Sequence, residues 1–253
     1  GMGNHYEKEK IKIIGKTKEF RTGGIGYNSF KGRLTEILGG EIFYLLKRLY
    51  LTFKIKKKYD YFVVVGDIGH FALQGFAKSA PERYYNLGIL EPTLVSVAAG
   101  LSKEGFYPIG HTIAPFIAER SLEQIKLDFC YQNLGGNLIT VGSAFDYATL
   151  GCTHHCYTDL GLLSSYPNTE VCYPSSPAEL KELLLQKYSS KSLTYFRMAR
   201  TSHNQNFKKI EFGVNILVEQ GDDLTILASG PQLNTALKIR DLLKLEGVST
   251  EII

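Results

Sequence analysis

The sequence has no tryptophan, two methionines and only four cysteines among 253 residues. No two cysteines form a CxxC pair, and a chain of this length does not need disulfide bonds to stabilise its core. We therefore expect free thiols in a reducing compartment, with a cytoplasmic location as the default. The excess of positive over negative charge is also small, since the formal net charge is +4. Lysines gather within 54–58 and at 208–209 without interleaved aromatic residues, which favours solvated faces over a nucleic-acid-binding surface.

Long apolar runs are absent as well. A helix that spans a bilayer needs about 20 consecutive apolar residues, and no stretch reaches that length. The N-terminal residues are charged and lack the apolar core of a signal peptide. From Leu34 to Leu49 apolar residues recur at helical spacing before a basic end, which predicts an amphipathic helix that packs on the core and not on a membrane.

What the sequence does have is a regular alternation of short apolar runs, rich in β-branched residues, with segments of helical spacing. This pattern predicts an α/β fold with a mostly parallel sheet covered by helices on both faces. We expect strands at 61–66, 84–87, 106–111, 137–141, 170–173 and 193–196, and helices at 91–103, 117–131, 158–165 and 177–188.

The alternation also divides the chain. Residues 1–59 form an N-terminal segment with the amphipathic helix, and 60–200 form the main domain. The polar stretch 201–222 reads as a linker, and 223–253 contain one strand-helix-strand unit. Because a single unit of this kind is too small to bury its own core, it either docks on the main domain or is the truncated start of a larger domain.

Two stretches carry residues suited to chemistry. Glu91 stands before Pro92 at the start of an otherwise apolar helix, where the helix dipole favours a carboxylate. Phe116 follows a proline at a strand end, and Arg120 lies four residues further on. On spacing alone, an ordinary capping acid and a core aromatic residue beside surface charges are the simpler interpretations of these residues.

A third stretch, 150–180, has paired histidines on a glycine-bearing loop. Cys152, His154, His155 and Cys156 are all ligands that zinc accepts. Structural zinc sites, however, usually draw their ligands from two separated pairs, and neighbouring residues rarely all face one ion. We expect no metal site there.

Together the three stretches resemble the pyrimidine-binding domain of the transketolase family, which includes transketolase, 1-deoxyxylulose-5-phosphate synthase and the β subunits of 2-oxoacid dehydrogenases. The resemblance covers about residues 60–200 and continues weakly into 221–253. The matching residues are Asn86, Gly88, Ile89, Glu91, Ala98, Ala99, Gly100, Gly151, Thr153, His154, Tyr166, Pro167, Asn168, Tyr173 and Pro174.

The resemblance implies thiamine diphosphate as cofactor, bound in the thiamine-diphosphate-binding fold. In this family a glutamate hydrogen-bonds the pyrimidine ring nitrogen and promotes the tautomer that activates the thiazolium carbon. Glu91 matches that catalytic glutamate, and a carboxyl group needs a dry site for this work. Phe116 matches the aromatic residue that stacks on the pyrimidine, and Asp67 lies where the family lines the cofactor site.

The substrate side follows from the same resemblance. His154 matches the histidine that faces the substrate's oxygen atoms, so it is a catalytic and substrate-binding candidate. Arg200 lies where the family often places an arginine for a substrate phosphate, and a guanidinium suits that contact. His70 and Arg120 are further substrate-binding candidates.

Three departures from the family pattern concern the substrate. Pro92 stands where most relatives have glutamine, Leu150 where transketolases have an aspartate that contacts the donor sugar, and Cys152 where they have proline. They put the ordinary pentose phosphate substrate in question and leave cofactor activation untouched.

The family holds the diphosphate and Mg²⁺ with a GDG motif in a separate domain. The nearest strings in this chain, Gly66-Asp67-Ile68 and Gly221-Asp222-Asp223, do not match it. The resemblance therefore implies a hetero-oligomer with a GDG-bearing partner subunit that holds Mg²⁺, together with self-dimerisation.

The function implied is that of the C-terminal-type subunit of a split enzyme that transfers a ketol group between sugar phosphates or related sugars. Two alternatives stay open. One is an enzyme like 1-deoxyxylulose-5-phosphate synthase or a 2-oxoacid dehydrogenase β subunit, and the other is a degenerate, non-catalytic scaffold or regulatory subunit.

Overall fold

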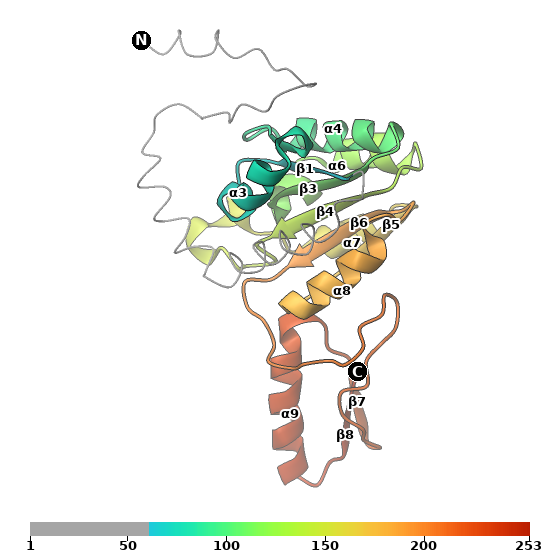
Figure 1. The fold of residues 1–253 in the computed structure, drawn as a ribbon. Helices are drawn as coiled ribbons and strands as arrows, with labels where there is room; N and C mark the ends of the chain where they lie inside the picture. The colour runs from blue at the N-terminus through green and yellow to red at the C-terminus, as the bar shows by residue number, and fades with distance from the viewer. Residues whose placement is uncertain (1–60) are drawn as a thin grey trace.

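The structure, a computed structural model, describes residues 61–253. The expected helix at 34–49 and the segment 1–59 lie outside the described residues. The main sheet has six strands, all parallel, in the order β2-β1-β3-β4-β6-β5 (Figure 1). Its strands are β1 (Tyr61–Val65), β2 (Tyr84–Asn86), β3 (Tyr107–Ile113), β4 (Gly136–Val141), β5 (Thr169–Cys172) and β6 (Leu193–Met198). The expected α/β fold with a parallel sheet is confirmed.

Helices cover both faces of the sheet. They are α3 (His70–Ser79), α4 (Glu91–Lys103), α5 (Ala114–Ala118), α6 (Leu122–Gln124), the π-helix η2 (Ile125–Cys130), α7 (Asp159–Ser164) and α8 (Pro177–Lys187). Val63 and Val65 belong to the apolar cluster with α3 and α8, whereas Val64 belongs to the cluster with α4, α5, η2 and α7. The alternation follows from the two-residue repeat of a strand, and it explains why β1 is apolar throughout.

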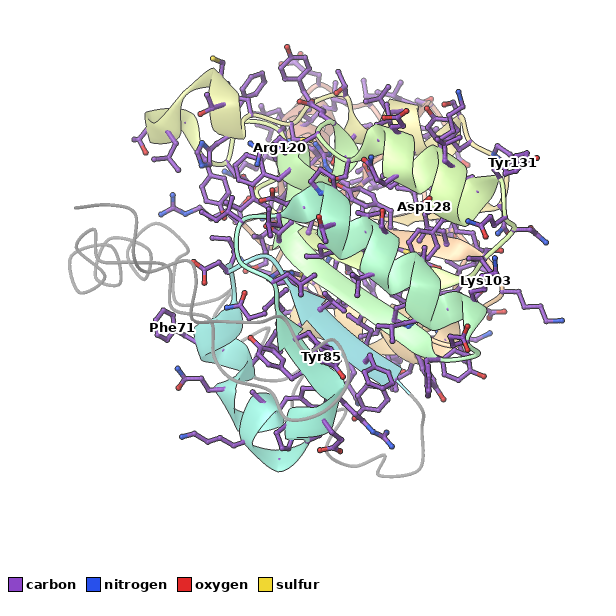
Figure 2. The ribbon with its side chains drawn as sticks, turned by 90° about the horizontal axis from the view of Figure 1, so that it is seen from above. Phe71, Tyr85, Lys103, Arg120, Asp128 and Tyr131 are labelled. Atoms are coloured by element: carbon purple, nitrogen blue, oxygen red, sulfur yellow. The ribbon has the colours of Figure 1, made fainter. Side chains whose placement is uncertain are left out.

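The position of α4 depends on a close approach to the sheet. A Cβ atom added at Gly110 of β3 would lie 2.9 Å from a methyl carbon of Leu138 and 3.0 Å from one of Leu94. Any larger residue at this position would push the helix outward. Figure 2, seen from above, shows α4 lying along the strands, so its first residue comes to the carboxyl edge of the sheet.

The expected single helix at 117–131 is wrong. The helix begins earlier, at Ala114, and α5 ends at Ala118. It ends there because the Ser121 hydroxyl donates to the Phe116 carbonyl at 2.8 Å, and the Arg120 amide donates to the Pro115 carbonyl at 3.0 Å. The chain then turns through α6 into η2. Helix α3 was not expected from the sequence.

The C-terminal unit consists of β7 (Leu224–Ile226), the short turn η5 (Gly230–Gln232), α9 (Leu233–Leu245) and β8 (Thr250–Ile252), with β7 and β8 parallel. Figure 1 shows it extending from the α8 end of the main domain. Its small core includes Leu233, Ala236 and Ile252, with Phe207 and Val218 of the preceding stretch packed against it.

Polar contacts connect the stretch after β6 to both parts of the chain. The imidazole of His203 bonds the carboxyl group of Glu179 in α8, and this carboxyl also accepts from the Ser175 amide at 2.7 Å. On the other side, the Asn234 side chain of α9 donates to the Ser202 carbonyl at 3.1 Å. The unit is therefore held against the main domain through this stretch.

The structure also bears on the cysteines and on membrane-spanning helices. All four cysteines are free, with Cys152 exposed and the other three buried. Within residues 61–253, no helix combines the length and apolar character needed to cross a membrane.

His111, in the middle of β3, carries a pH-dependent stability that can be measured. Its Nδ1 lies 2.7 Å from the Ile139 carbonyl oxygen and must donate to it, and its Nε2 is buried without a partner. Burial lowers the pKa of His111 from 6.5 to about 4, and the Ile139 hydrogen bond offsets only part of this. Between pH 6.5 and about pH 4 the imidazole is protonated in the unfolded chain but stays neutral in the folded chain. The free energy of unfolding therefore decreases as the pH is lowered through this window.

We expect His111 to remove roughly 3 kcal/mol of unfolding free energy between pH 7 and pH 4, at 1.36 kcal/mol per pKa unit. Urea titrations at several pH values, on the native chain and on His111→Leu, isolate this contribution because the carboxyl groups titrate alike in both. Equal pH slopes in the two proteins would contradict the prediction.

Candidate active site

The sequence candidates converge because they follow the carboxyl ends of different parallel strands. Asp67 follows β1, Glu91 follows β2, Phe116 follows β3, His154 follows β4 and Arg200 follows β6. In a parallel sheet these ends share one edge, where α/β proteins place their ligands at the points at which the strand order reverses. Such a reversal occurs at β1, whose neighbours β2 and β3 lie on opposite sides.

Glu91 is the first residue of α4, and only 1% of its surface is exposed. The partial positive charge at the helix N-terminus favours its carboxylate. A guanidinium N–H (Nη1) of Arg120 donates to its Oε2 at 2.9 Å. A carboxyl group buried this deeply needs such a partner, since an unpaired buried charge is costly.

Arg120, Phe116 and His154 continue the chain of contacts from Glu91. The guanidinium carbon of Arg120 lies 4.2 Å from the centre of the Phe116 ring, a cation–π contact. The His154 ring meets the Phe116 ring edge to face at 5.2 Å. Four residues predicted from the sequence thus form one continuous cluster, the Glu91 cluster, made of Glu91, Arg120, Phe116 and His154.

His154 lies in the short turn η4 (Cys152–His154). Its Nδ1 and the Thr153 hydroxyl are hydrogen-bonded at 2.9 Å, and its ring lies 6.1 Å from that of Tyr147. Partial burial, together with the positive charge of Arg120 and the neighbouring His155, lowers the pKa of His154. The imidazole is therefore neutral at neutral pH and can accept or donate a proton.

The loop that carries His154 is closed at its base. Ala144 and Cys156 form an antiparallel bridge with two backbone hydrogen bonds of 2.8 Å. Gly142 precedes the loop with a φ of +83°, and a Cβ there would lie 2.1 Å from the ring of Tyr147. Only glycine therefore lets the Tyr147 ring lie against the end of β4.

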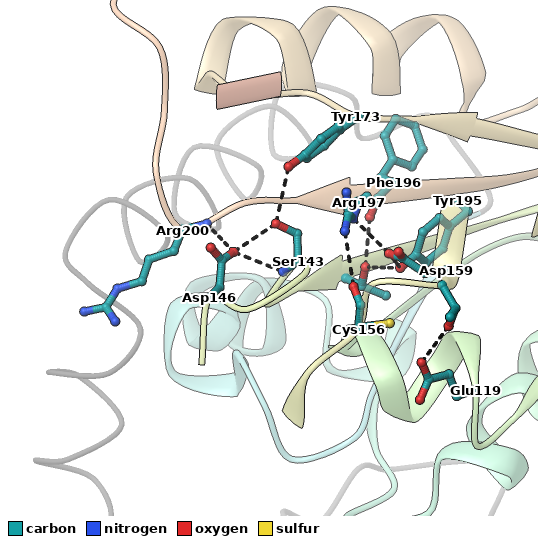
Figure 3. Close-up of polar contacts among 12 residues, drawn as sticks. Glu119, Ser143, Asp146, Cys156, Asp159, Tyr173, Tyr195, Phe196, Arg197 and Arg200 are labelled. Atoms are coloured by element: carbon teal, nitrogen blue, oxygen red, sulfur yellow. Dashed lines mark hydrogen bonds and ion pairs between the residues drawn. The ribbon is translucent and has the colours of Figure 1, made fainter. Parts of the chain in front are cut away.

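A buried ionic network supports this loop from beneath (Figure 3). The Nε of Arg197 lies 3.0 Å from Oδ2 of Asp159, and its Nη2 donates to the Cys156 carbonyl at 3.2 Å. The Tyr195 hydroxyl donates to the same Asp159 oxygen at 2.8 Å and accepts from Thr140 at 2.9 Å. Burial raises the pKa of Asp159, although Arg197 and Tyr195 oppose that effect.

This network was not predicted from the sequence. Its visible signal is Arg197 inside the otherwise apolar strand LTYFRM, because a buried arginine requires an acidic partner. Nothing in the spacing identifies Asp159 as that partner.

Asp67 contacts the loop that leads to Glu91. It has a φ of +63°, its amide donates to the Asn86 side-chain oxygen at 3.0 Å, and its carboxylate accepts from the Asn86 amide group at 3.2 Å. The same Asn86 oxygen accepts from the Gly88 amide at 3.0 Å. These bonds fix the path of the chain just before α4.

Arg200 and His70 follow the ends of β6 and β1 in the chain. The Arg200 amide donates to Asp146 Oδ2 at 2.8 Å, while its exposed side chain points away from Asp146 and Ser143 (Figure 3). His70 is the first residue of α3, directly after Gly69. Among residues 61–253, no group of three or more His, Cys, Asp or Glu side chains is arranged to hold a metal ion.

The fold and the Glu91 cluster define an α/β domain with its site at the carboxyl edge of a parallel sheet. Residues 56–205 match the family model described as the transketolase pyrimidine-binding domain. The chain belongs to this family.

Individual relatives agree with the assignment. The chain is 30% identical to a subunit of apulose-4-phosphate transketolase from Actinobacillus succinogenes, over 70% of its own length and 58% of that protein's. It is 36% identical to 1-deoxy-D-xylulose-5-phosphate synthase of Aquifex aeolicus over 70% of its length and 29% of that protein's. The match thus spans little more than half of the first relative and less than a third of the second. A solved split-gene transketolase, an inactive β4 tetramer, superposes with a TM-score of 0.73 at 28% identity, covering 83% of this chain and 69% of that one.

Proposed function

We propose that this chain is the C-terminal-type subunit of a thiamine-diphosphate-dependent transketolase that transfers a ketol group between sugar phosphates or related sugars. The observation that carries the proposal is the Glu91 cluster, in which Arg120 contacts both a buried carboxyl group and an aromatic face. An aminopyrimidine fits these residues, because it can hydrogen-bond the carboxyl and stack on the ring.

In this function Glu91 holds and shares a proton at the pyrimidine ring nitrogen, and Phe116 orients the ring by stacking. When bound, the cofactor supplies the electron sink for carbon–carbon bond cleavage. His154, neutral at working pH, exchanges protons with the substrate's oxygen atoms. Arg200 and, once it is released from Glu91, Arg120 contact the substrate phosphate, with His70 and Asp67 at the mouth of the site.

The proposal divides the chain into the segment 1–59, a pyrimidine-binding domain over 60–200, a linker at 201–222 and the start of a C-terminal domain at 223–253. A partner subunit with a GDG motif supplies the diphosphate and Mg²⁺ site. Neither string in this chain resembles such a site in its contacts: Asp67 bonds Asn86, and Asp223 accepts from the Ser249 amide at 2.8 Å.

Exposed apolar residues near the site support the proposal of a partner subunit. Several large apolar side chains that flank Glu91 or His154 in the chain are exposed: Ile89, Leu90, Phe145, Leu150 and Tyr157. Exposed apolar side chains gathered around one site are typical of surfaces that a partner covers. A tetramer of β subunits alone is inactive in the split-gene transketolase, which fits both self-association and dependence on a partner.

A second candidate is an enzyme like 1-deoxyxylulose-5-phosphate synthase, which the identity to the Aquifex protein favours, or like a 2-oxoacid dehydrogenase β subunit. Substrate profiling separates the two, because this candidate decarboxylates a 2-oxoacid. A non-catalytic scaffold is the third candidate, but a scaffold has no use for a buried acid beside an exposed aromatic rim.

Calorimetry of thiamine diphosphate binding with Mg²⁺ tests the proposal. We expect binding by a mixture of this chain with a GDG-bearing subunit, and none at comparable concentration by this chain alone. Absence of binding in the mixture would leave the scaffold as the better account. Tight binding by this chain alone would contradict the dependence on a partner.

Within that mixture, Phe116→Leu should weaken cofactor binding by about 2- to 10-fold, because ring stacking contributes roughly 0.5–1.5 kcal/mol. Phe106→Leu is the matched control, since Phe106 precedes β3 at the opposite edge of the sheet and contacts Phe62. Equal losses in the two variants would show that Phe116 does not stack on the cofactor.

A further inference from the structure

Arg120 makes two contacts at once with the Glu91 cluster. Its guanidinium donates to the Glu91 carboxylate at 2.9 Å and lies over the face of Phe116 at 4.2 Å from the ring centre. Glu91 and Phe116 are the two residues that the proposed function assigns to the pyrimidine. One side chain therefore already makes both contacts that the pyrimidine needs.

The match between the two groups is chemical as well as spatial. A guanidinium is planar, carries several N–H donors and stacks on aromatic faces, and an aminopyrimidine is also planar, nitrogen-rich and able to stack. A single carboxylate beside a single ring cannot offer the same hydrogen bond and the same stacking position to both. We propose that Arg120 is an internal mimic of the aminopyrimidine, which must leave Glu91 and Phe116 before the cofactor's pyrimidine binds. This inference rests on the proposed function.

The surroundings of Arg120 permit this exchange. Its side chain is 47% exposed, whereas that of Glu91 is 2% exposed, so the arginine can swing into solvent without disturbing the core. Its backbone stays fixed, because Ser121 donates to the Phe116 carbonyl and Glu119 accepts from the Thr158 hydroxyl at 2.8 Å. Arg120 is thus a positioning residue that keeps Glu91 paired and keeps the face of Phe116 covered until the pyrimidine takes over both contacts.

The direction in which ligand affinity changes on removal of Arg120 distinguishes this exchange from a purely structural role. If Arg120 merely stabilised the site, its removal would weaken ligand binding. If it competes, its removal strengthens binding, because the ligand no longer displaces a hydrogen bond to a charged group. We expect Arg120→Ala to bind the pyrimidine about tenfold more tightly, the fold-change that corresponds to one such hydrogen bond.

The probe is the aminopyrimidine half of thiamine, as its hydroxymethyl derivative, which needs no diphosphate site and can be titrated into the full chain alone. Ligand-observed NMR gives the dissociation constants for the native chain, for Arg120→Ala and for the control Lys181→Gln. Lys181 lies on the exposed side of α8 in a surface pair with Glu182, so its loss should change nothing. Circular dichroism establishes that each variant is folded.

A second measurement uses the native chain and does not depend on the folding of a variant. The Arg120 guanidinium N–H resonance, assigned with an Arg120→Lys chain, should shift to its solvent-exposed position as the aminopyrimidine is added. Saturation of the site without any change in this resonance would overturn the inference.

The remaining outcomes separate the inference from the function beneath it. Equal or weaker binding by Arg120→Ala, with clear binding by the native chain, overturns the competition and leaves the proposed function standing. No binding of the aminopyrimidine to either chain, together with no thiamine diphosphate binding by the mixture with a GDG-bearing subunit, overturns both.

Discussion

Replacing Glu91 by glutamine should lower the turnover of the reconstituted enzyme by about 10²- to 10⁴-fold, the range attributed to a positioned proton-transfer group. Glutamine has the same shape and its amide oxygen can still accept from Arg120, so the fold and the Arg120 contact are retained. What it loses is the ability to share a proton with the pyrimidine ring. The measurement is kcat with saturating thiamine diphosphate, Mg²⁺ and partner subunit.

Glu104→Gln is the matched control for this experiment. Glu104 follows the last residue of the same helix, on the exposed end far from the site. We expect its turnover to equal that of the native chain. A Glu91→Gln enzyme that keeps more than about one tenth of the native kcat would show that the carboxyl proton is not needed, and the proposed function would lose its main support.

The order of elements could be predicted because local pattern and tertiary environment agree in this chain. Strands buried on both faces must be apolar throughout, as the run YFVVV in β1 is, and α4 begins and ends where its apolar spacing indicates. Helix α3 was not predicted because Gly75 stands in the middle of its sequence HFALQGFAKS, and glycine is unfavourable in a helix interior. The end of the helix at Ala118 was not predicted because it depends on the hydrogen bond from the Ser121 hydroxyl to the Phe116 carbonyl. This bond competes with the helix only once the turn has formed.

The candidate site divides in the same way. Glu91, Phe116 and His154 could be found because they match the family pattern, and the topology brings them to one edge because each follows the carboxyl end of a parallel strand. The ion pair of Glu91 with Arg120 could not, since it depends on the turn that interrupts the helix expected at 117–131. Arg200 follows the end of its strand as the sequence indicates, but the contact with Asp146 is made by its backbone amide and not by its guanidinium, which the sequence does not reveal.

The largest stability effect should come from the buried network beneath the His154 loop. Asp159→Ala leaves the guanidinium of Arg197 buried without its carboxylate, because Asp159 is fully buried and the Arg197 side chain is only 7% exposed. Breaking a buried pair by removing one partner costs about 3–5 kcal/mol. We expect a loss of that size in the free energy of unfolding, measured by urea denaturation at pH 7.

The pair itself need not be worth that much. Burial raises the pKa of Asp159 in spite of the neighbouring Arg197, which indicates that desolvation outweighs the attraction between the two groups. A double variant, Asp159→Leu with Arg197→Met, should therefore recover most of the loss, since apolar residues of similar volume often replace a buried pair at little cost. The turnover of this double variant should be lower than that of the native chain, because the side chain introduced by Arg197→Met has no N–H donor to hold the Cys156 carbonyl at the base of the His154 loop. An Asp159→Ala chain that loses less than about 1 kcal/mol would mean that water reaches Arg197, and a double variant as unstable as the single one would mean that the ion pair stabilises the fold directly.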